Sequence, residues 1–166
     1  MSLDRGFTLI EITIVLFVIG LLSSLVILGI APNRAALADQ EARRLAALFE
    51  LAFAEARGTG QALAWSPEYN GYSFWHQTED GDWVRFPVTS VYRRRTLADL
   101  VTLESVSLGA RKIRVDERIP FAPHGLHDPI EATIRGGDVQ LILRGGVLGR
   151  ISLERGPTAD SRFHTN

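Results

Sequence analysis

The stretch RGFTLIEITIVLFVIGLLSSLVILGIA, residues 5–31, decides how this chain of 166 residues is organised. Between Arg5 and Arg34 the only ionisable side chain is that of Glu11, and residues 12–31 carry no charge at all. As a helix these uncharged residues would be about 30 Å long, which matches the hydrocarbon core of a bilayer. Helices in the cores of soluble domains rarely need so long an uncharged stretch. The stretch therefore predicts a membrane-spanning helix.

Two simpler interpretations explain this stretch less well. Residues 36–38, Ala-Leu-Ala, have the small-x-small form of a signal-peptide cleavage site. However, the apolar part of a signal peptide is only ~7–15 residues long, and here Pro32 and Arg34 separate it from the candidate cleavage site. A plain transmembrane anchor explains the length but not Glu11, because a carboxylate inside the apolar boundary is costly without a partner. An acidic residue in such a place indicates a function.

Residues 5–11, followed by the apolar run, resemble the N-terminal motif of type IV pilins and type II secretion pseudopilins. The resemblance implies a leader at residues 1–6, cleavage between Gly6 and Phe7 by a prepilin peptidase, and methylation of the new N-terminus at Phe7. Glycine suits this site because a backbone without a side chain enters a tight protease cleft. The family's role for the acid transfers to Glu11, which would pair with the Phe7 amine of a neighbouring subunit. Such a pair is much stronger in a low dielectric than in water, and it would set the axial register between subunits.

The second segment, residues 32–57, has the pattern of an amphipathic helix. Charged residues fill one face, and the glycines at 58 and 60 are expected to end the helix. Gly29 and Pro32 are expected to bend or loosen the junction with the membrane helix, residues 7–31. Small and apolar residues line the other face as a candidate core: Ala38, Ala42, Leu45, Leu48, Phe49, Ala52, Phe53 and Ala56.

Residues 58–155 alternate mostly with the period of β-strands, and residues 156–166 have no apolar face and read as a flexible tail. The clearest part is residues 130–153, where glycine pairs separate three alternating runs and predict an antiparallel meander. A turn is expected at residues 67–71 and a hairpin at Asp80-Gly81, whereas residues 88–110 are poorly patterned, with a short helix or loop expected near 97–101. A helix followed by antiparallel strands predicts an α+β fold with a sandwich-like β domain.

This arrangement resembles the H subunit of type II secretion and the related FimT/FimU group of minor pilins. The resemblance implies a minor pseudopilin in the bacterial inner membrane, with its N-terminus cytoplasmic and its C-terminal domain periplasmic. Its implied partners are major and minor pseudopilins, the prepilin peptidase, the inner-membrane assembly platform and the lipid bilayer, and its task is to help export folded proteins across the outer membrane. Two alternatives stay open: a minor pilin of a type IV pilus, including one that binds DNA, and an unrelated single-pass periplasmic binding protein.

The sequence indicates neither an enzyme nor a cofactor or metal site. It contains no cysteine, no phosphate-binding glycine loop and no nucleophile elbow. The histidines at 124 and 127 with Asp128 lie in a proline-bracketed loop without helical ligand spacing, and the acids at 79–82 fit a hairpin turn better than a calcium loop. Arg93-Arg94-Arg95 is most simply a solvated face, and the formal net charge of −1 argues against nucleic acid as the main partner.

Overall fold

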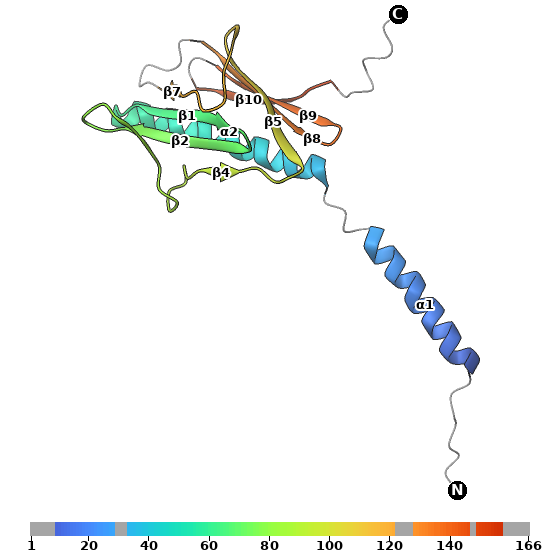
Figure 1. Ribbon diagram of the computed structural model, residues 1–166. Coiled ribbons are helices and arrows are strands. Elements are labelled where there is room, and N and C mark those ends of the chain that lie inside the picture. The colour runs from blue at the N-terminus through green and yellow to red at the C-terminus, as the bar shows by residue number, and fades with distance from the viewer. Residues whose placement is uncertain (1–8, 29–32, 122–127, 147–148, 158–166) are drawn as a thin grey trace, which may run out of the picture. The chain divides into compact units, whose positions relative to one another are not determined.

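The computed structural model describes residues 9–28, 33–121, 128–146 and 149–157 (Figure 1). The chain divides into two compact units, residues 1–33 and residues 34–166. The described part of the first unit is a helix, and the second unit combines a helix with antiparallel strands. The predicted α+β class is therefore confirmed. The predicted leader, the junction at Gly29 and Pro32, and the predicted tail from residue 158 onward lie outside the described residues.

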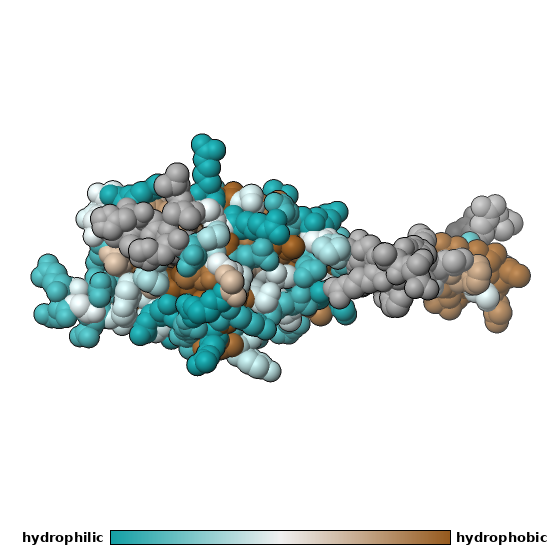
Figure 2. Space-filling model, turned by 90° about the horizontal axis from the view of Figure 1, so that it is seen from above, coloured by the Kyte–Doolittle hydropathy of each residue, from teal (hydrophilic) through white to brown (hydrophobic). Residues whose placement is uncertain are grey.

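The first helix, α1, runs from Leu9 to Leu28. The part of this helix that is coloured in Figure 2 is mostly hydrophobic, and Glu11 lies in its first turn, where the helix dipole favours a negative charge. Among the described residues, no helix is both long enough and apolar enough to cross a membrane. The span predicted at 7–31 extends past the described residues at both of its ends.

The second helix, α2, runs from Arg34 to Thr59. Its C-terminus is capped by Gly60, which has a φ of 71° and donates its N–H to the carbonyl of Ala56 at 3.0 Å. Glycine favours this left-handed position because it has no Cβ. The predicted stripe is confirmed in full, since the buried residues of α2 are Ala38, Ala42, Leu45, Leu48, Phe49, Ala52, Phe53 and Ala56.

Two antiparallel sheets pack around α2 in the described part of the chain (Figure 1). The first sheet has the order β3-β2-β1-β7, with β4 paired to β2, and the second has the order β10-β9-β8-β5-β6. The strands are β1 Leu63–Glu68, β2 Gly71–Gln77, β3 Trp83–Arg85, β4 Arg95–Thr96, β5 Val101–Leu108, β6 Arg111–Lys112, β7 Ile119–Phe121, β8 Ile130–Gly136, β9 Val139–Gly145 and β10 Ile151–Arg155.

The predicted C-terminal meander is confirmed as β8, β9 and β10. The turn expected at residues 67–71 is confirmed but is shorter, because β1 continues to Glu68, β2 begins at Gly71, and the turn consists of Tyr69 and Asn70. The hairpin at Asp80-Gly81 connects β2 to β3, and Gly81 has a φ of 88°.

The strand that the sequence pattern missed is β5, which lies between β8 and β6. A bulge shifts its register against β8 between Leu103 and Ser105. Val101 and Leu103 face the interior before the bulge, and Val106 does so after it, so the inward positions lose their period of two. Of the helix or loop expected near residues 97–101, the structure has the loop, because irregular backbone at 97–98 and a turn at 99–100 lead into β5.

The centre of the core is the ring of Phe49 on α2. It meets the rings of Trp65, Phe121 and Phe74 edge to face, with centroid distances of 5.1, 5.3 and 6.2 Å. Edge-to-face pairs of this kind stabilise a core beyond the apolar area that they bury. Phe49 thus contacts β1, β2 and β7 at once.

The N-terminal end of α2 approaches β8 very closely at Gly136. A Cβ added to Gly136 would lie 2.3 Å from the Arg34 carbonyl oxygen and 2.7 Å from the Ala38 Cβ. Ala38 is itself fully buried. A signal-peptide cut at residues 36–38 would therefore fall inside a helix that the domain buries.

We expect Gly136→Ala to destabilise the fold by about 1–3 kcal/mol, because the added methyl group overlaps backbone atoms that cannot rotate away. Thermal and chemical denaturation of the full chain measure this change. The matched control is Gly58→Ala in α2, because a Cβ at this position meets nothing within 4 Å. This substitution should stabilise the helix by up to about 1 kcal/mol. Equal stabilities for the two variants would contradict the close approach.

Candidate functional site: the apolar helix and the outer face of the first sheet

Of the three residues predicted to act in processing and assembly, the structure places one. Glu11 lies on α1 with its side chain exposed, while Gly6 and Phe7 lie outside the described residues. Large apolar side chains surround Glu11 on all sides of the helix and are exposed as well. They are Leu9, Ile10, Ile12, Ile14, Val15, Leu16, Phe17, Val18 and Ile19.

A helix that is apolar all round is stable in only two settings, inside a protein or inside a membrane. In the described part of α1 the apolar side chains around Glu11 are exposed. Ile10, for example, is 68% exposed and Phe17 is 69% exposed. Once covered, the carboxylate of Glu11 would leave water, which is costly unless a cation pairs with it. The described side chains of α1 therefore form an exposed apolar surface that contains a single carboxylate, that of Glu11.

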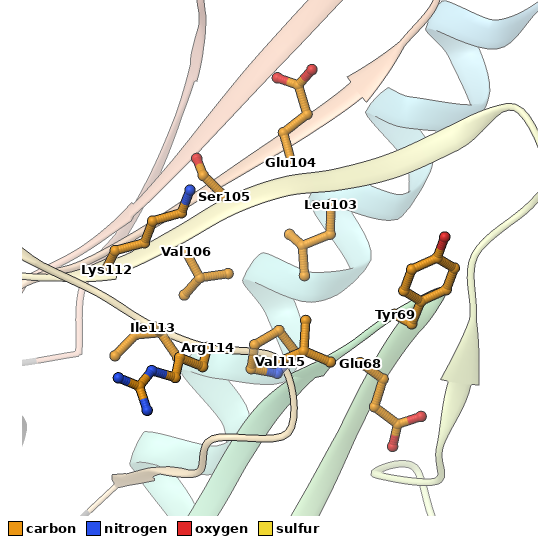
Figure 3. Close-up of a pocket in the computed structure, with 11 residues that line it drawn as sticks. Glu68, Tyr69, Leu103, Glu104, Ser105, Val106, Lys112, Ile113, Arg114 and Val115 are labelled. Carbon is orange, nitrogen blue, oxygen red and sulfur yellow. The ribbon is translucent and has the colours of Figure 1, made fainter.

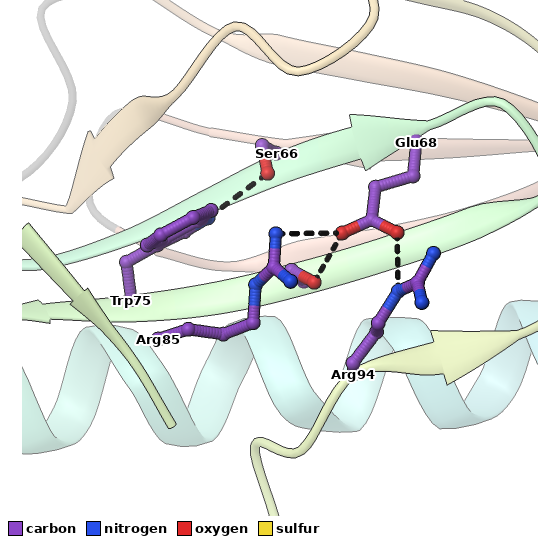
Figure 4. A network of polar contacts seen from close by, with 6 residues as sticks. Ser66, Glu68, Trp75, Arg85 and Arg94 are labelled. Atoms are coloured by element: carbon purple, nitrogen blue, oxygen red, sulfur yellow. Dashed lines mark hydrogen bonds and ion pairs between the residues drawn. The ribbon is translucent and has the colours of Figure 1, made fainter. Parts of the chain in front are cut away.

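The outer face of the first sheet carries a polar network centred on Glu68 (Figure 4). The Glu68 side chain is only 8% exposed. Its carboxylate accepts hydrogen bonds from the Ser73 hydroxyl and from the Arg94 Nε, the latter at 2.6 Å, and an Arg85 guanidinium nitrogen lies 3.4 Å away. This carboxylate of β1 therefore contacts β2, β3 and the residue that precedes β4.

Trp75 extends the network on the same face. Its indole N–H donates to the Ser66 hydroxyl at 2.9 Å, and the guanidinium carbons of Arg85 and Arg118 lie 4.6 and 5.0 Å from the ring centroid. Both distances are within the range of cation–π attraction. Arg85 therefore connects Glu68 to Trp75, and the sheet presents a rigid face on which arginines outnumber carboxylates.

The pKa of Glu68 reflects its surroundings. Burial on its own raises the pKa of this carboxyl, but the hydrogen bonds from Ser73 and Arg94 and the charges of Arg94 and Arg85 outweigh burial and hold the pKa below its ordinary value. The network is thus strongest when Glu68 is ionised.

The arginine run at 93–95 does not form one solvated face. Arg94 pairs with Glu68, whereas Arg95 lies in β4, where its Nε is buried and has no hydrogen-bond partner among the described residues. Arg93 is half-buried.

The candidate metal ligands are not brought together where the structure describes them. In the described ranges no three His, Cys, Asp or Glu side chains are placed to hold a metal ion. The histidines at 124 and 127 lie outside those ranges, so their loop stays untested. The acids at 79–82 belong to the β2–β3 turn, which is closed by a hydrogen bond from the Thr78 N–H to the Asp82 carbonyl at 2.8 Å.

Several polar contacts were not anticipated because their partners are far apart in sequence. Glu68 and Arg94 are one example, and Tyr92 and Glu55 are another, with the Tyr92 hydroxyl donating to the Glu55 carboxylate at 2.7 Å. Burial, together with this carboxylate, raises the pKa of Tyr92. The only sequence signal was the presence of Glu68 and Trp75 next to inward-facing positions of β1 and β2.

No model of a known protein family matches the chain, and no curated protein sequence matches it. Solved structures do match.

Two of them are structures of the minor pseudopilin EpsH from the type II secretion system of Vibrio cholerae. One matches with a TM-score of 0.58 and 17% identity over 74% of this chain and 97% of the other. The second, a crystal structure, matches with a TM-score of 0.61 and 18% identity over 75% and 98%. This chain therefore has the fold of a minor pseudopilin, and the predicted resemblance is confirmed at the level of the fold.

We expect Glu68→Gln to destabilise the fold by roughly 1 kcal/mol at pH 7, because the charge-assisted bonds to Arg94 and Arg85 are lost. The folded pKa of Glu68 is lowered, so its stabilisation is complete above the unfolded pKa near 4.5 and disappears as the pH falls through the folded value. The difference between wild type and variant should therefore shrink below about pH 4.5. Urea unfolding at several pH values measures it, with Glu50→Gln on the exposed face of α2 as the control. A difference that is constant with pH would contradict the assignment.

Proposed function

We propose that this chain is a minor pseudopilin of a type II secretion pseudopilus. It would assemble through α1, whose apolar surface contacts the membrane and then neighbouring pseudopilins, and it would present its β domain to other minor pseudopilins in the periplasm. The observation that carries the proposal is a domain with the fold of a minor pseudopilin joined to an apolar helix with a single acid, Glu11, in its first turn. An assembly of this kind would help to export folded proteins across the outer membrane.

The roles of residues in this proposal follow from chemistry. Prepilin peptidase would cut between Gly6 and Phe7 and methylate the new amine. That amine is the cation that a covered Glu11 carboxylate needs, and an apolar surrounding strengthens their attraction. The pair would align one subunit on the next during assembly from the inner-membrane platform. No catalytic role, metal or cofactor enters the proposal.

A minor pilin of a type IV pilus is the second candidate, since the outer face of the first sheet exposes Arg85, Arg94 and Arg118. Three arginines that contact phosphates would give a DNA affinity that falls steeply with salt. Duplex-DNA binding that is lost between low and physiological salt would favour the pilus. The absence of such binding favours the secretion pseudopilus.

We expect the protein purified from membranes to begin at a methylated Phe7 when prepilin peptidase is co-expressed, and at residue 1 when it is not. Intact mass and N-terminal sequencing measure both forms. The Gly6→Val variant is the matched control, because a branched side chain at the cut site should block cleavage. The substitution lies in the leader, so the sequence from Phe7 onward is unchanged. An uncleaved chain in the presence of the peptidase would return the protein to a simple membrane anchor.

We expect Glu11→Val to be cleaved normally but to enter filaments about tenfold less well, because the cationic amine of the neighbouring subunit loses its partner. The assay is the fraction of the protein that sediments with filaments when it is expressed with its host's pseudopilins and assembly platform. Thr13→Val is the control, since the Thr13 hydroxyl bonds only to the Leu9 carbonyl of its own helix. Unchanged incorporation of Glu11→Val would remove the register role.

A further inference from the structure

A groove of about 640 Å³ opens in the β domain where the end of β1, the middle of β5 (residues 103–106) and the segment 112–115 come together (Figure 3). Side chains from all three parts line it. Those that matter here are Tyr69, Leu103, Val106, Lys112, Ile113 and Val115.

One wall of the groove is an open strand edge. β5 pairs with β8 from Val101 to Leu108 except at the bulge between Leu103 and Ser105, but on its other side it pairs with β6 only at Ser107 and Leu108. The Val106 carbonyl still accepts the Ile113 N–H at 2.9 Å, and beyond this bond no described strand continues along residues 101–105. A strand edge of this kind presents backbone donors and acceptors that a further strand can pair with.

The floor of the groove is apolar. Leu103 and Val106 point from β5 toward Ile113 and Val115 (Figure 3). Val115 is 55% exposed, and Tyr69 at the other end is 97% exposed. Apolar side chains of an incoming strand would cover these surfaces while its backbone pairs with the edge.

The exposed charges at the rim of the groove are mainly positive. Glu104 and Glu68 point away from the groove, and each is already held by an arginine, Arg135 and Arg94 respectively. Lys112 and Arg114 stay at the rim on exposed positions. The segment 111–118 carries four basic and two acidic residues, and of the acids Glu117 is engaged by Arg111 and by the Arg114 N–H. The groove therefore favours a negatively charged occupant.

We propose that this groove binds an extended segment of a partner polypeptide, which adds to the open edge of β5 as a strand. Its alternate apolar side chains contact Leu103 and Val115, and a carboxylate near one end faces Lys112 and Arg114. Backbone hydrogen bonds supply affinity in this mode, and the pockets for alternate side chains supply specificity.

An extended segment fits better than a helix or a nucleic acid. Within the groove the open edge consists of residues 103–105, or roughly 10 Å of strand, and a helical occupant would leave the backbone hydrogen-bonding groups of this edge unpaired. The bulge at Leu103–Ser105 keeps the edge from pairing along a long regular stretch, which limits aggregation between copies and suits a short segment. This inference goes beyond the proposed function, because it does not depend on processing or filament assembly.

The test is to select peptides of roughly ten residues from a random displayed library on the full-length protein in detergent, with counter-selection on Val115→Asp. The peptides are then synthesised, and their affinity is measured by fluorescence anisotropy. We expect enriched sequences that alternate apolar residues and carry Asp or Glu at one end. Methylation of alternate backbone nitrogens should abolish their binding, because it removes the donors that pair with the edge.

Matched variants locate the site. Val115→Asp and Lys112→Glu should each weaken binding by about tenfold or more. Val91→Asp, at a valine that is also 55% exposed, and Arg150→Glu, just before the opposite edge strand β10, should leave the affinity unchanged within about twofold. Since Lys112 is exposed, its variant tests the site even if Val115→Asp does not fold. No enrichment, equal binding to all variants, or full binding of the methylated peptides would overturn the proposal.

Discussion

The packing of α2 against both sheets is the interaction on which the rest of the structure depends. At its N-terminal end small residues, Ala38 and Ala42, let the helix approach β8 until only a glycine fits at position 136. Toward its C-terminal end Phe49 and Phe53 fill the wider space between the sheets, where they meet Trp65 and Phe121. Because one helix contacts strands of both sheets, it determines how the sheets sit against each other. Interiors packed this closely transmit strain, so a single methyl group at the close approach is felt across the domain.

That shared helix also explains why polar chemistry is confined to the outer faces and the rim. With the inner faces filled by α2, the charged residues gather in compact networks such as Glu68 with Arg85 and Arg94. Where the sheets diverge at the end of β1 and along β5, no described strand completes the edge, and the groove opens there. The groove is thus a consequence of how the sheets are held, and its cationic rim is what remains after the nearby carboxylates have paired with arginines.

The two units of the chain meet different physical demands. The β domain buries its apolar residues within itself, whereas α1 exposes them on every side and gains stability only from what covers it.

The sequence by itself determined the features that depend on local periodicity and on single conformational requirements. The uncharged run from 12 to 31, the buried stripe of α2 and the glycine-separated meander were all predictable, because side-chain spacing directly reports which face is buried. Only the tertiary structure decided the place of β5, the Glu68 network and the groove. The bulge at Leu103–Ser105 breaks the period that identifies a strand, and contacts such as Glu68 with Arg94 join residues whose proximity arises from strand pairing and not from spacing along the chain.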